Sequence, residues 1–429
     1  MRIARPLPVV AALSVAALTL AACSGQNDDP TEPAGPEGGD DAPAEVVELT
    51  MWTGFTGGDR GAYEDLVAAF NESHDTIQVT MEIQPWDTIA QSLPAAWATG
   101  QGPDLATPNF DPNIIGEYLE TESLLPLDAI GDGPEQINVD DLAPAAIEAF
   151  TVDGTLYAVP ANVATLQLYY NKALFADAGI DAPPATVDEF RDHAVRLTGD
   201  GVYGLSVGER ETIQMWPILQ WLDGADIVDE DGCSVLDSSA SIESLTTWAQ
   251  LAQDGVMPVG LTGAESDSLF SAGQAAMQLN GPWAAAGYLD AGIDLGVAPV
   301  PTGVDGDVTL ASTVPLAVSA STEHPAEAQQ FLAWWTGQEA QRQFALASGF
   351  PPVRTDLADD AELNANEIVS AFAAALPSAR LYLQGVPNAS RVDAEAYVPL
   401  IGEITRGTDV ADAAAAASAT LDGLTGCEG

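Results

Sequence analysis

From residue 46 to the C-terminus, short apolar stretches of strand length alternate with longer stretches of helical periodicity. Residues 46–52 and 77–83 have the length and composition of strands, whereas 63–70 and 88–98 repeat their apolar residues with the period of a helix. Such alternation predicts an α/β fold. About 380 residues follow the N-terminal region, which is enough chain for two lobes of ordinary domain size.

One stretch, 270–283, ends a predicted strand in a turn that presents a large aromatic side chain. Gly273 breaks the preceding helical pattern, 275–279 is apolar and strand-sized, and the turn 280–282 is Asn-Gly-Pro, which cannot continue a ladder. Trp283 then stands at the carboxyl end of a strand, where open α/β sheets bind their ligands. A core tryptophan beneath a loop is the alternative, because most large aromatic side chains serve packing.

The residue pattern of 273–283, Gly-x-Ala-Ala-Met followed after a short gap by Gly-Pro-Trp, resembles a motif of the extracellular solute-binding proteins that serve ABC sugar importers. The maltodextrin-binding branch is the nearest likeness. In that branch the tryptophan stacks on a sugar ring, so the resemblance implies the same role for Trp283. An indole matches the apolar C–H face of a sugar, and nearby hydrogen-bonding side chains match its rim of hydroxyls.

The resemblance also implies a two-lobed, periplasmic-binding-protein-like α/β fold, in which hinge strands join lobes built from discontinuous segments. The expected boundaries place the N-terminal lobe at 46–162 and 303–335, and the C-terminal lobe at 163–302 and 336–427. A ligand that enters the cleft would bridge the two lobes and favour their closed arrangement.

The resemblance implies two acidic positions as ligand contacts. The glycine-rich loop after the first predicted strand ends in Asp59 and Arg60, where maltodextrin-binding relatives carry an Asp-Lys pair that meets sugar hydroxyls. Asp111, with Phe110 beside it, falls where relatives carry a sugar-contacting aspartate. A solvated loop carboxylate is the alternative for Asp111.

Further positions follow from the same likeness. Trp216 matches an aromatic residue on the second lobe's side of the cleft, although burial beneath the following helix is the alternative. Where the relatives carry an acidic residue that binds the sugar, this chain has Ala164. We therefore expect Asn162 and Thr165 to supply polar groups, and we expect the preferred sugar to differ from that of the relatives. The loop 348–354 resembles the segment that returns to the cleft. The expected ligand-binding residues are Phe55, Asp59, Arg60, Phe110, Asp111, Asn162, Thr165, Trp216, Trp283 and Phe350.

The N-terminus has the pattern of a bacterial lipoprotein signal peptide, predicted here for 1–22. Basic residues precede an apolar run that ends in Leu-Ala-Ala-Cys at Cys23. A membrane span is the alternative, but the run is well below the ~20 residues that a bilayer needs. Residues 23–45 are mostly acidic residues, small residues and prolines. This composition predicts a disordered tether that starts at a lipidated Cys23. We therefore expect a secreted protein that is lipid-anchored to the outer face of the cell membrane.

The remaining cysteines, Cys233 and Cys427, are predicted to form a disulfide. Of the three cysteines in the chain, Cys23 is committed to lipid, and the other two lie outside the cytoplasm, where disulfides persist. Two free thiols are the alternative.

The charge balance is strongly acidic. The chain has 64 acidic and 12 basic residues, with Lys172 as the single lysine. Binding to nucleic acid would require the opposite sign, so we expect no such partner. An acidic surface is suited to a salty medium, where carboxylate repulsion is screened. The competing explanation is a cationic ligand, such as a polyamine or metal ions.

The sequence has no motif of catalysis. It contains no nucleophile elbow, no H-E-x-x-H, no P-loop, and no histidines with metal-ligand spacing. A secreted glycoside hydrolase would need two opposed carboxylates, and acids are too common in this chain to exclude such a pair by counting. We predict a monomeric binding protein, without catalytic residues, cofactor or metal. As the family resemblance implies, it is expected to deliver a carbohydrate, in particular an oligosaccharide, to an ABC permease in the membrane.

Overall fold

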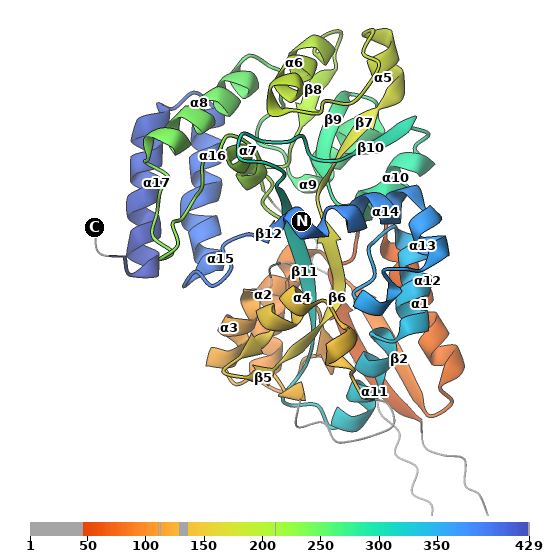
Figure 1. The fold of residues 1–429 in the computed structure, drawn as a ribbon. Coiled ribbons are helices and arrows are strands. Elements are labelled where there is room, and N and C mark those ends of the chain that lie inside the picture. The colour runs from red at the N-terminus through yellow and green to blue at the C-terminus, as the bar shows by residue number, and fades with distance from the viewer. Residues whose placement is uncertain (1–45, 110, 112, 128–135, 211, 428–429) are drawn as a thin grey trace, which may run out of the picture. The chain divides into compact units, whose positions relative to one another are not determined.

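The computed structural model describes residues 46–109, 111, 113–127, 136–210 and 212–427 (Figure 1). The residues that it describes belong to one compact unit. The predicted signal peptide, Cys23, the tether and Phe110 lie outside the described residues. None of the helices in the described part combines the length and the hydropathy that a membrane crossing requires.

Among the described residues, six strands form a mixed sheet, here called the first sheet. They are β1 (Val47–Thr53), β2 (Ile77–Ile83), β3 (Leu105–Ala106), β6 (Ala158–Thr165), β11 (Thr309–Val318) and β12 (Ala379–Leu381). β1 is parallel to β2 and β3, β11 is antiparallel to β3 and β6, and β12 is parallel to β11. Because Thr53 pairs with Ile83, the carboxyl ends of β1 and β2 lie side by side. The loops that follow these two strands therefore start at the same edge of the sheet.

A second sheet has four strands within the described part of the chain. Its strands, in spatial order, are β10 (Leu295–Ala298), β7 (Gln167–Asn171), β9 (Ala275–Asn280) and β8 (Tyr203–Ser206). β7 is antiparallel to both of its neighbours, whereas β8 and β9 are parallel. A separate hairpin joins β4 (Thr151–Val152) to β5 (Thr155–Leu156). The predicted strand 275–279 is thus the interior strand β9, and Trp283 follows its carboxyl end.

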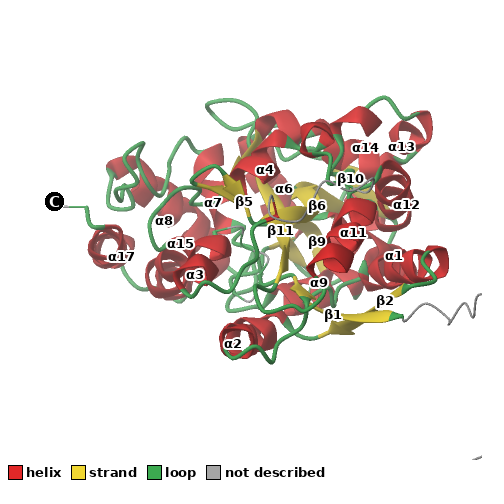
Figure 2. Ribbon diagram, turned by 90° about the horizontal axis from the view of Figure 1, so that it is seen from below, coloured by secondary structure: helices red, strands yellow, loops and turns green. Residues whose placement is uncertain are grey.

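Helices flank the strands (Figure 2). The helices that pack around the first sheet are α1 (Arg60–Ser73), α2 (Trp86–Ala98), α3 (Ile114–Glu120), α4 (Pro144–Ala149), α11 (Pro325–Trp335) and α12 (Gln338–Ser348). The others are α5 (Lys172–Asp177), α6 (Val187–Leu197), α7 (Trp216–Leu222), α8 (Ser239–Gln253), α9 (Gly263–Ser271), α10 (Ala285–Asp290), α13 (Ala361–Ala365), α14 (Glu367–Ala374), α15 (Ala389–Val392), α16 (Val398–Thr405) and α17 (Val410–Thr425). Short 3₁₀ turns are η2 (Val139–Asp141), η3 (Pro282–Ala284), η4 (Thr355–Leu357) and η5 (Leu376–Ser378), and η6 (Asp393–Tyr397) is a π turn.

The core of the first sheet shows why α1 forms and where it packs. Its buried residues Tyr63, Leu66, Val67 and Phe70 follow the spacing i, i+3, i+4, i+7, which puts them on one face of the helix. This face packs on the sheet in a cluster that includes the apolar residues of β1.

Helix α12 belongs to the same core. The ring of Phe344 lies 4.6 Å from that of Tyr63 on α1, and Phe350, just beyond α12, is 1% exposed in the same cluster. The boundary expected from the sequence assigned both of these phenylalanines to the other lobe. They pack against the first sheet because α12 follows α11 after a turn of two residues and lies against α1.

The chain crosses between the two sheets at adjacent strands. β6 of the first sheet ends at Thr165, and β7 of the second begins at Gln167; the return runs from β10 to β11. The two crossings are bonded to each other, since Leu166 N donates to Leu310 O at 3.0 Å and Thr309 Oγ1 donates to Leu166 O at 2.7 Å. β6 and β11 run side by side through the middle of Figure 1.

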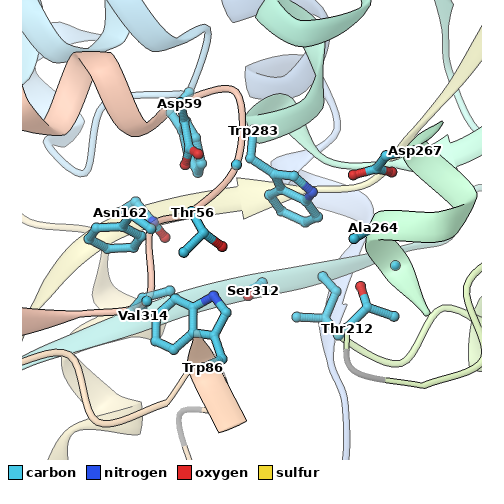
Figure 3. A pocket seen from close by; sticks show the side chains of 16 residues that line it. Thr56, Asp59, Trp86, Asn162, Thr212, Ala264, Asp267, Trp283, Ser312 and Val314 are labelled. Carbon is cyan, nitrogen blue, oxygen red and sulfur yellow. The ribbon is translucent and has the colours of Figure 1, made fainter. Parts of the chain in front are cut away.

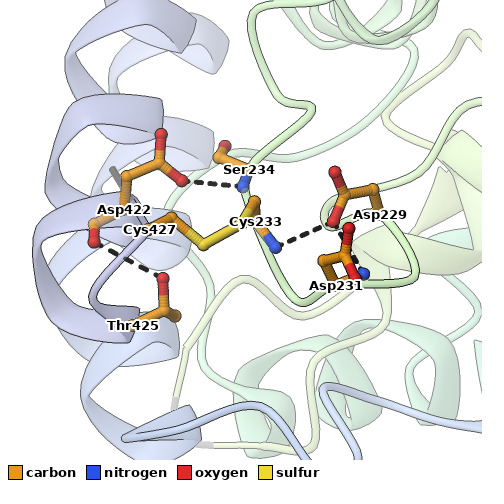
Figure 4. The surroundings of a disulfide bond; sticks show 7 residues. All are labelled: Asp229, Asp231, Cys233, Ser234, Asp422, Thr425 and Cys427. Atoms are coloured by element: carbon orange, nitrogen blue, oxygen red, sulfur yellow. Dashed lines mark hydrogen bonds between the residues drawn. A yellow bond between two sulfur atoms is a disulfide. The ribbon is translucent and has the colours of Figure 1, made fainter. Parts of the chain in front are cut away.

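The sulfur atoms of Cys233 and Cys427 are 2.05 Å apart, at bonding distance (Figure 4). Cys233 lies in the loop before α8, and Cys427 follows the end of α17. A hydrogen bond joins the same two segments next to the disulfide, since Ser234 N donates to Asp422 Oδ1 at 2.8 Å. The C-terminal helix is therefore tied to the segment before α8.

Candidate functional site

A cavity of about 220 Å³ lies between segments that belong to the two sheets (Figure 3). One side consists of the loop after β1, the start of α2, and residues of β6 and β11. The other side consists of Thr212, the first turn of α9, and Trp283 after β9. The cavity is hereafter called the first cavity. A ligand in the first cavity would contact segments of both sheets at the same time.

Two indole rings, those of Trp86 and Trp283, reach the first cavity from opposite sides (Figure 3). Each ring lies against a glycine. A Cβ atom added to Gly54 would come within 2.0 Å of the Trp86 ring, and one added to Gly281 would come within 2.0 Å of the Trp283 ring. Since real Cβ atoms do not approach other atoms so closely, both indoles hold their positions because the facing residue has no side chain.

The loop after β1 approaches the Trp283 turn through its main chain. A Cβ atom on Gly58 would lie 2.9 Å from Gly287 N and 3.1 Å from Trp283 O. The turn is held from the other side by Tyr169, whose hydroxyl donates to Gly281 O at 3.0 Å. The glycine-rich sequence of the loop therefore serves close packing against the turn, and the loop ends in Asp59.

Asp59 is a buried acid on the wall of the first cavity. It is 5% exposed and immediately precedes α1, yet its side chain makes no cap bond to that helix. Among the described residues, the carboxylate receives a hydrogen bond from its own main-chain N–H and from no other residue. Burial raises the pKa of Asp59 to about 7. The floor beside it is rigid, because Phe55 stacks on Tyr63 with ring centroids 3.6 Å apart and Asn162 Nδ2 donates to Tyr63 Oη at 2.6 Å.

Asp267, on α9, is a second acid of the first cavity, and it is fixed by a polar network. Its Oδ1 accepts hydrogen bonds from Gln278 Nε2 at 3.0 Å, Asn280 Nδ2 at 2.6 Å and Tyr288 Oη at 3.0 Å. Burial raises the pKa of Asp267, while these donors oppose the rise. Because all three donors meet one oxygen, the carboxylate has a single orientation at the cavity wall.

A second cavity of about 140 Å³ adjoins the first and shares Thr212, Ile213 and Ser312 with it. It contains two more acids. Asp111 accepts a hydrogen bond from Ser390 Oγ at 3.0 Å, and Asp393 accepts one from Tyr382 Oη at 2.9 Å.

Burial raises the pKa of both acids of the second cavity. The pKa of Asp393 reaches about 6, and the charge of Asp111 adds to this rise. The hydroxyl of Tyr382 opposes it by donating a hydrogen bond. Two carboxylates therefore share this small space with neutral partners. In the part of the chain that the structure describes, no group of three or more His, Cys, Asp and Glu side chains is placed to hold a metal ion.

A sequence profile of bacterial extracellular solute-binding proteins matches residues 65–371. The chain belongs to this family. A Brucella abortus protein named as a binding protein is 28% identical over 357 residues, which cover 79% of this chain and 84% of that protein. The maltotriose-binding protein of Pyrococcus abyssi is 26% identical over 359 residues, covering 78% of this chain and 72% of that protein.

Among solved structures, the GacH receptor of Streptomyces glaucescens, studied unliganded and with acarbose, has a TM-score of 0.79 and 24% identity, covering 90% of this chain and all of that one. The solute-binding protein thus has the two-lobed α/β fold of periplasmic binding proteins, as the sequence predicted. The predicted family is confirmed as well. Membership in an extracellular family implies a secreted or surface location, and the family's members are binding proteins.

The structure brings six of the expected residues of this solute-binding protein to the two cavities. Phe55, Asp59, Asn162, Trp283 and Phe350 line the first cavity, and Asp111 lines the second. Trp283 is only partly buried, unlike the core tryptophans Trp248 and Trp335.

Three other expected residues do not reach the cavities. Arg60, the first residue of α1, is exposed, and its Nε pairs with Glu64 Oε1 at 2.8 Å, one turn further along the helix. Thr165 is buried at the chain crossing, where its Oγ1 donates to Phe372 O at 2.8 Å. Trp216 is 1% exposed in the core of the second sheet, as its packing alternative predicted. None of these three side chains lines either cavity.

Sequence reasoning missed Trp86, Asp267 and Asp393. A signal for Trp86 was present, since it follows the predicted strand 77–83 and a strand's carboxyl end is where ligands bind. The two acids gave no signal, because they stand within turns of helix among many other acids. Tertiary contacts alone bring them to the cavities.

Proposed function

We propose that this solute-binding protein is the substrate-binding lipoprotein of an ABC transporter and captures a carbohydrate, in particular an oligosaccharide, between its two lobes. The observation that carries the proposal is the pairing of two indole faces with buried polar side chains in one cavity. Apolar ring faces suit the C–H faces of a sugar, and the carboxylates and the amide of Asn162 suit its hydroxyls. The names of relatives such as the maltotriose-binding and galactooligosaccharide-binding proteins agree with this ligand class.

The adjoining cavities support a ligand of more than one ring. Thr212, Ile213 and Ser312 border both spaces, so a chain of sugars could continue from the indoles toward Asp111 and Asp393. The ligand-binding set that we propose is Phe55, Trp86, Asp59, Asn162, Asp267, Trp283 and Phe350 in the first cavity, with Asp111 and Asp393 in the second.

Ligand capture would work through the crossing strands. We propose lobes near 46–162 with 303–335 and near 163–302 with 336–427, with α12 and Phe350 moved to the first of these by their packing. Rotation about the bonded strands β6–β7 and β10–β11 would open and close the cleft. A ligand shifts this equilibrium only through its higher affinity for the closed state.

The same proposal places the protein at the outer face of the cell membrane. Cys23 would carry the lipid, residues 23–45 would form the tether, and the closed monomer would dock on the transporter's permease. The disulfide between Cys233 and Cys427 and the strongly acidic composition are both compatible with a location outside the cytoplasm.

We propose that the protein binds without catalysis. The acids of the first cavity lie beside aromatic rings and a neutral polar network, and none of the described residues that line either cavity is a histidine or cysteine. The alternative, a secreted glycoside hydrolase, would release new reducing ends from an oligosaccharide during incubation.

Titration calorimetry with maltodextrins, galactooligosaccharides, simple sugars and spermidine tests the proposal. At a ligand concentration of about 100 times the Kd, binding to the native state alone should stabilise the protein by about 2.7 kcal/mol, so thermal shifts provide a rapid first screen. Binding of one or more carbohydrates supports the proposal. Binding of spermidine together with no response to any carbohydrate would overturn it.

A further inference from the structure

The two cavities contain carboxylates without a matching cation. Asp59 and Asp267 line the first cavity, and Asp111 and Asp393 line the second. Among the described residues that line either cavity, none is Lys, Arg or His. The ion pairs of the described chain involve other acids, such as the pair of Arg354 with Asp141. Within the described lining of the two cavities, no cationic side chain therefore balances these acids.

Three of the four acids have neutral donors. Asp267 receives hydrogen bonds from two amides and a tyrosine, Asp111 from Asn113 and Ser390, and Asp393 from Tyr382. Such donors satisfy lone pairs and orient the carboxylates, but they supply no positive charge.

Asp59 differs from the other three acids. Only 5% of Asp59 is exposed. Its carboxylate oxygens point toward the first cavity (Figure 3), and no other described residue donates a hydrogen bond to them. Burying an unpaired carboxylate is costly, and the cost is removed when a cation arrives with its own N–H donors. Trp283, on the same cavity, adds an aromatic face that attracts cations.

We infer that the ligand is a carbohydrate that carries a protonated nitrogen, an amino-sugar or imino-sugar unit, and that Asp59 receives this nitrogen while Trp283 covers the sugar ring. The inference rests on the proposed function and narrows its ligand class. A sugar hydroxyl could also donate to Asp59, but it would leave the Asp59 carboxylate without a compensating charge. An ammonium group would satisfy the lone pairs and balance the charge together.

Matched sugars provide the test. Calorimetry at neutral pH compares glucosamine, N-acetylglucosamine and glucose, the corresponding galactose series, and disaccharides of glucosamine, N-acetylglucosamine and glucose that share one linkage. These differ mainly in the group on one carbon atom. We expect the amino member of at least one series to bind tenfold or more tightly than its neutral counterparts, since a charge-assisted hydrogen bond is about twice as strong as a neutral one.

The Asp59→Asn variant, which keeps the shape and removes the charge, should lose most of this preference. Glu64→Gln is the matched control, because Glu64 is an exposed acid one turn further along α1 and its replacement changes the net charge equally. The control should retain the preference. The comparison of sugars on the unmodified protein stands by itself even if a variant fails to fold.

The remaining outcomes overturn the inference in distinguishable ways. Equal or tighter binding of the neutral sugars would overturn the charged-ligand inference and leave the proposed function standing. If Asp59→Asn still bound the amino sugar more tightly than the neutral sugars, Asp59 would not be the residue that receives the nitrogen. Failure of every carbohydrate, charged or neutral, would overturn the proposed function as well.

Discussion

Gly281 and Trp283 are related sterically: a Cβ atom on Gly281 would lie 2.0 Å from a carbon of the Trp283 ring. The position of the indole at the cavity thus depends on the lack of a side chain two residues earlier. Gly281→Ala should displace the ring and weaken carbohydrate binding by about tenfold or more, which corresponds to ~1.4 kcal/mol. Affinity measured by calorimetry checks this, and an unchanged Kd would show that the ring does not contact ligand.

Trp283→Ala should remove the ring itself. We expect a loss of about 2–4 kcal/mol of binding free energy, or roughly thirty- to a thousandfold in affinity, because stacked aromatic residues are frequent binding hot spots. The apo protein should lose less stability than the about 3–5 kcal/mol typical of a core aromatic, since the ring is only partly buried.

Trp334→Ala is the matched control for this change. Trp334 is also a partly buried tryptophan, but it packs on Phe70, 5.4 Å between ring centroids, and lines neither cavity. Its removal should leave affinity unchanged. Normal affinity of Trp283→Ala with a large fall in apo melting temperature would identify Trp283 as a packing residue.

Gly58→Ala tests the close approach between the loop after β1 and the Trp283 turn. The added methyl would meet Gly287 N at 2.9 Å and Trp283 O at 3.1 Å, both main-chain atoms that cannot rotate away. We expect a cost of about 1–3 kcal/mol, shared between apo stability and ligand affinity. Gly61→Ala is the control, because no atom lies within 4 Å of its Cβ position in α1, and alanine there should stabilise by about 0.5–1 kcal/mol. Equal behaviour of the two variants would contradict the steric argument.

Asp59 should make the apo protein less stable as pH rises. Its pKa is raised from 3.8 to about 7 in the folded chain, so the native state holds this proton more tightly than the unfolded state does. The contribution of Asp59 to stability is therefore greatest at low pH and falls as pH increases from about 4 to about 7, by up to about 4 kcal/mol. Asp393, whose pKa is raised from 3.8 to about 6, adds a change of the same sign between about pH 4 and 6.

Chemical denaturation of the apo protein across pH 5 to 8 measures this effect. Asp59→Asn should be more stable than the wild type at pH 8, should differ from it less at pH 5, and should show a smaller dependence on pH. Glu64→Gln, which removes an exposed acid, should follow the wild type. If the free energy of unfolding changed with pH in the same way for wild type and Asp59→Asn, a buried, unpaired Asp59 would be ruled out.

The bond between Cys233 and Cys427 should stabilise the fold by closing a loop of 194 residues. Replacing both cysteines by serine should cost about 2–5 kcal/mol of unfolding free energy, and a reducing agent should lower the melting temperature of the wild type but not of the variant. Neither cysteine lines the two cavities, so ligand affinity should be retained. Two reactive thiols in the unreduced, denatured protein would show that the bond does not form.

The sequence by itself determined the local elements, because their signals lie within a few residues. The apolar run 275–279 became the buried strand β9, and the apolar spacing of 63–70 placed one face of α1 on the core. The turn 280–282 likewise placed Trp283 beyond the end of its strand. Periodicity and turn chemistry act over neighbouring residues, so no knowledge of distant segments was needed.

The tertiary structure decided which polar side chains meet. Asp59 and Arg60 are adjacent in sequence, yet one is 5% exposed at the cavity and the other is exposed and paired with Glu64, because α1 begins between them. Asp59, Asp267 and Asp393 converge from three distant parts of the chain through the packing of loops and helices around the two sheets. Asp59 was expected from its place in the glycine-rich loop, but among 64 acidic residues the sequence did not distinguish Asp267 and Asp393, since burial and charge balance are properties of the assembled fold.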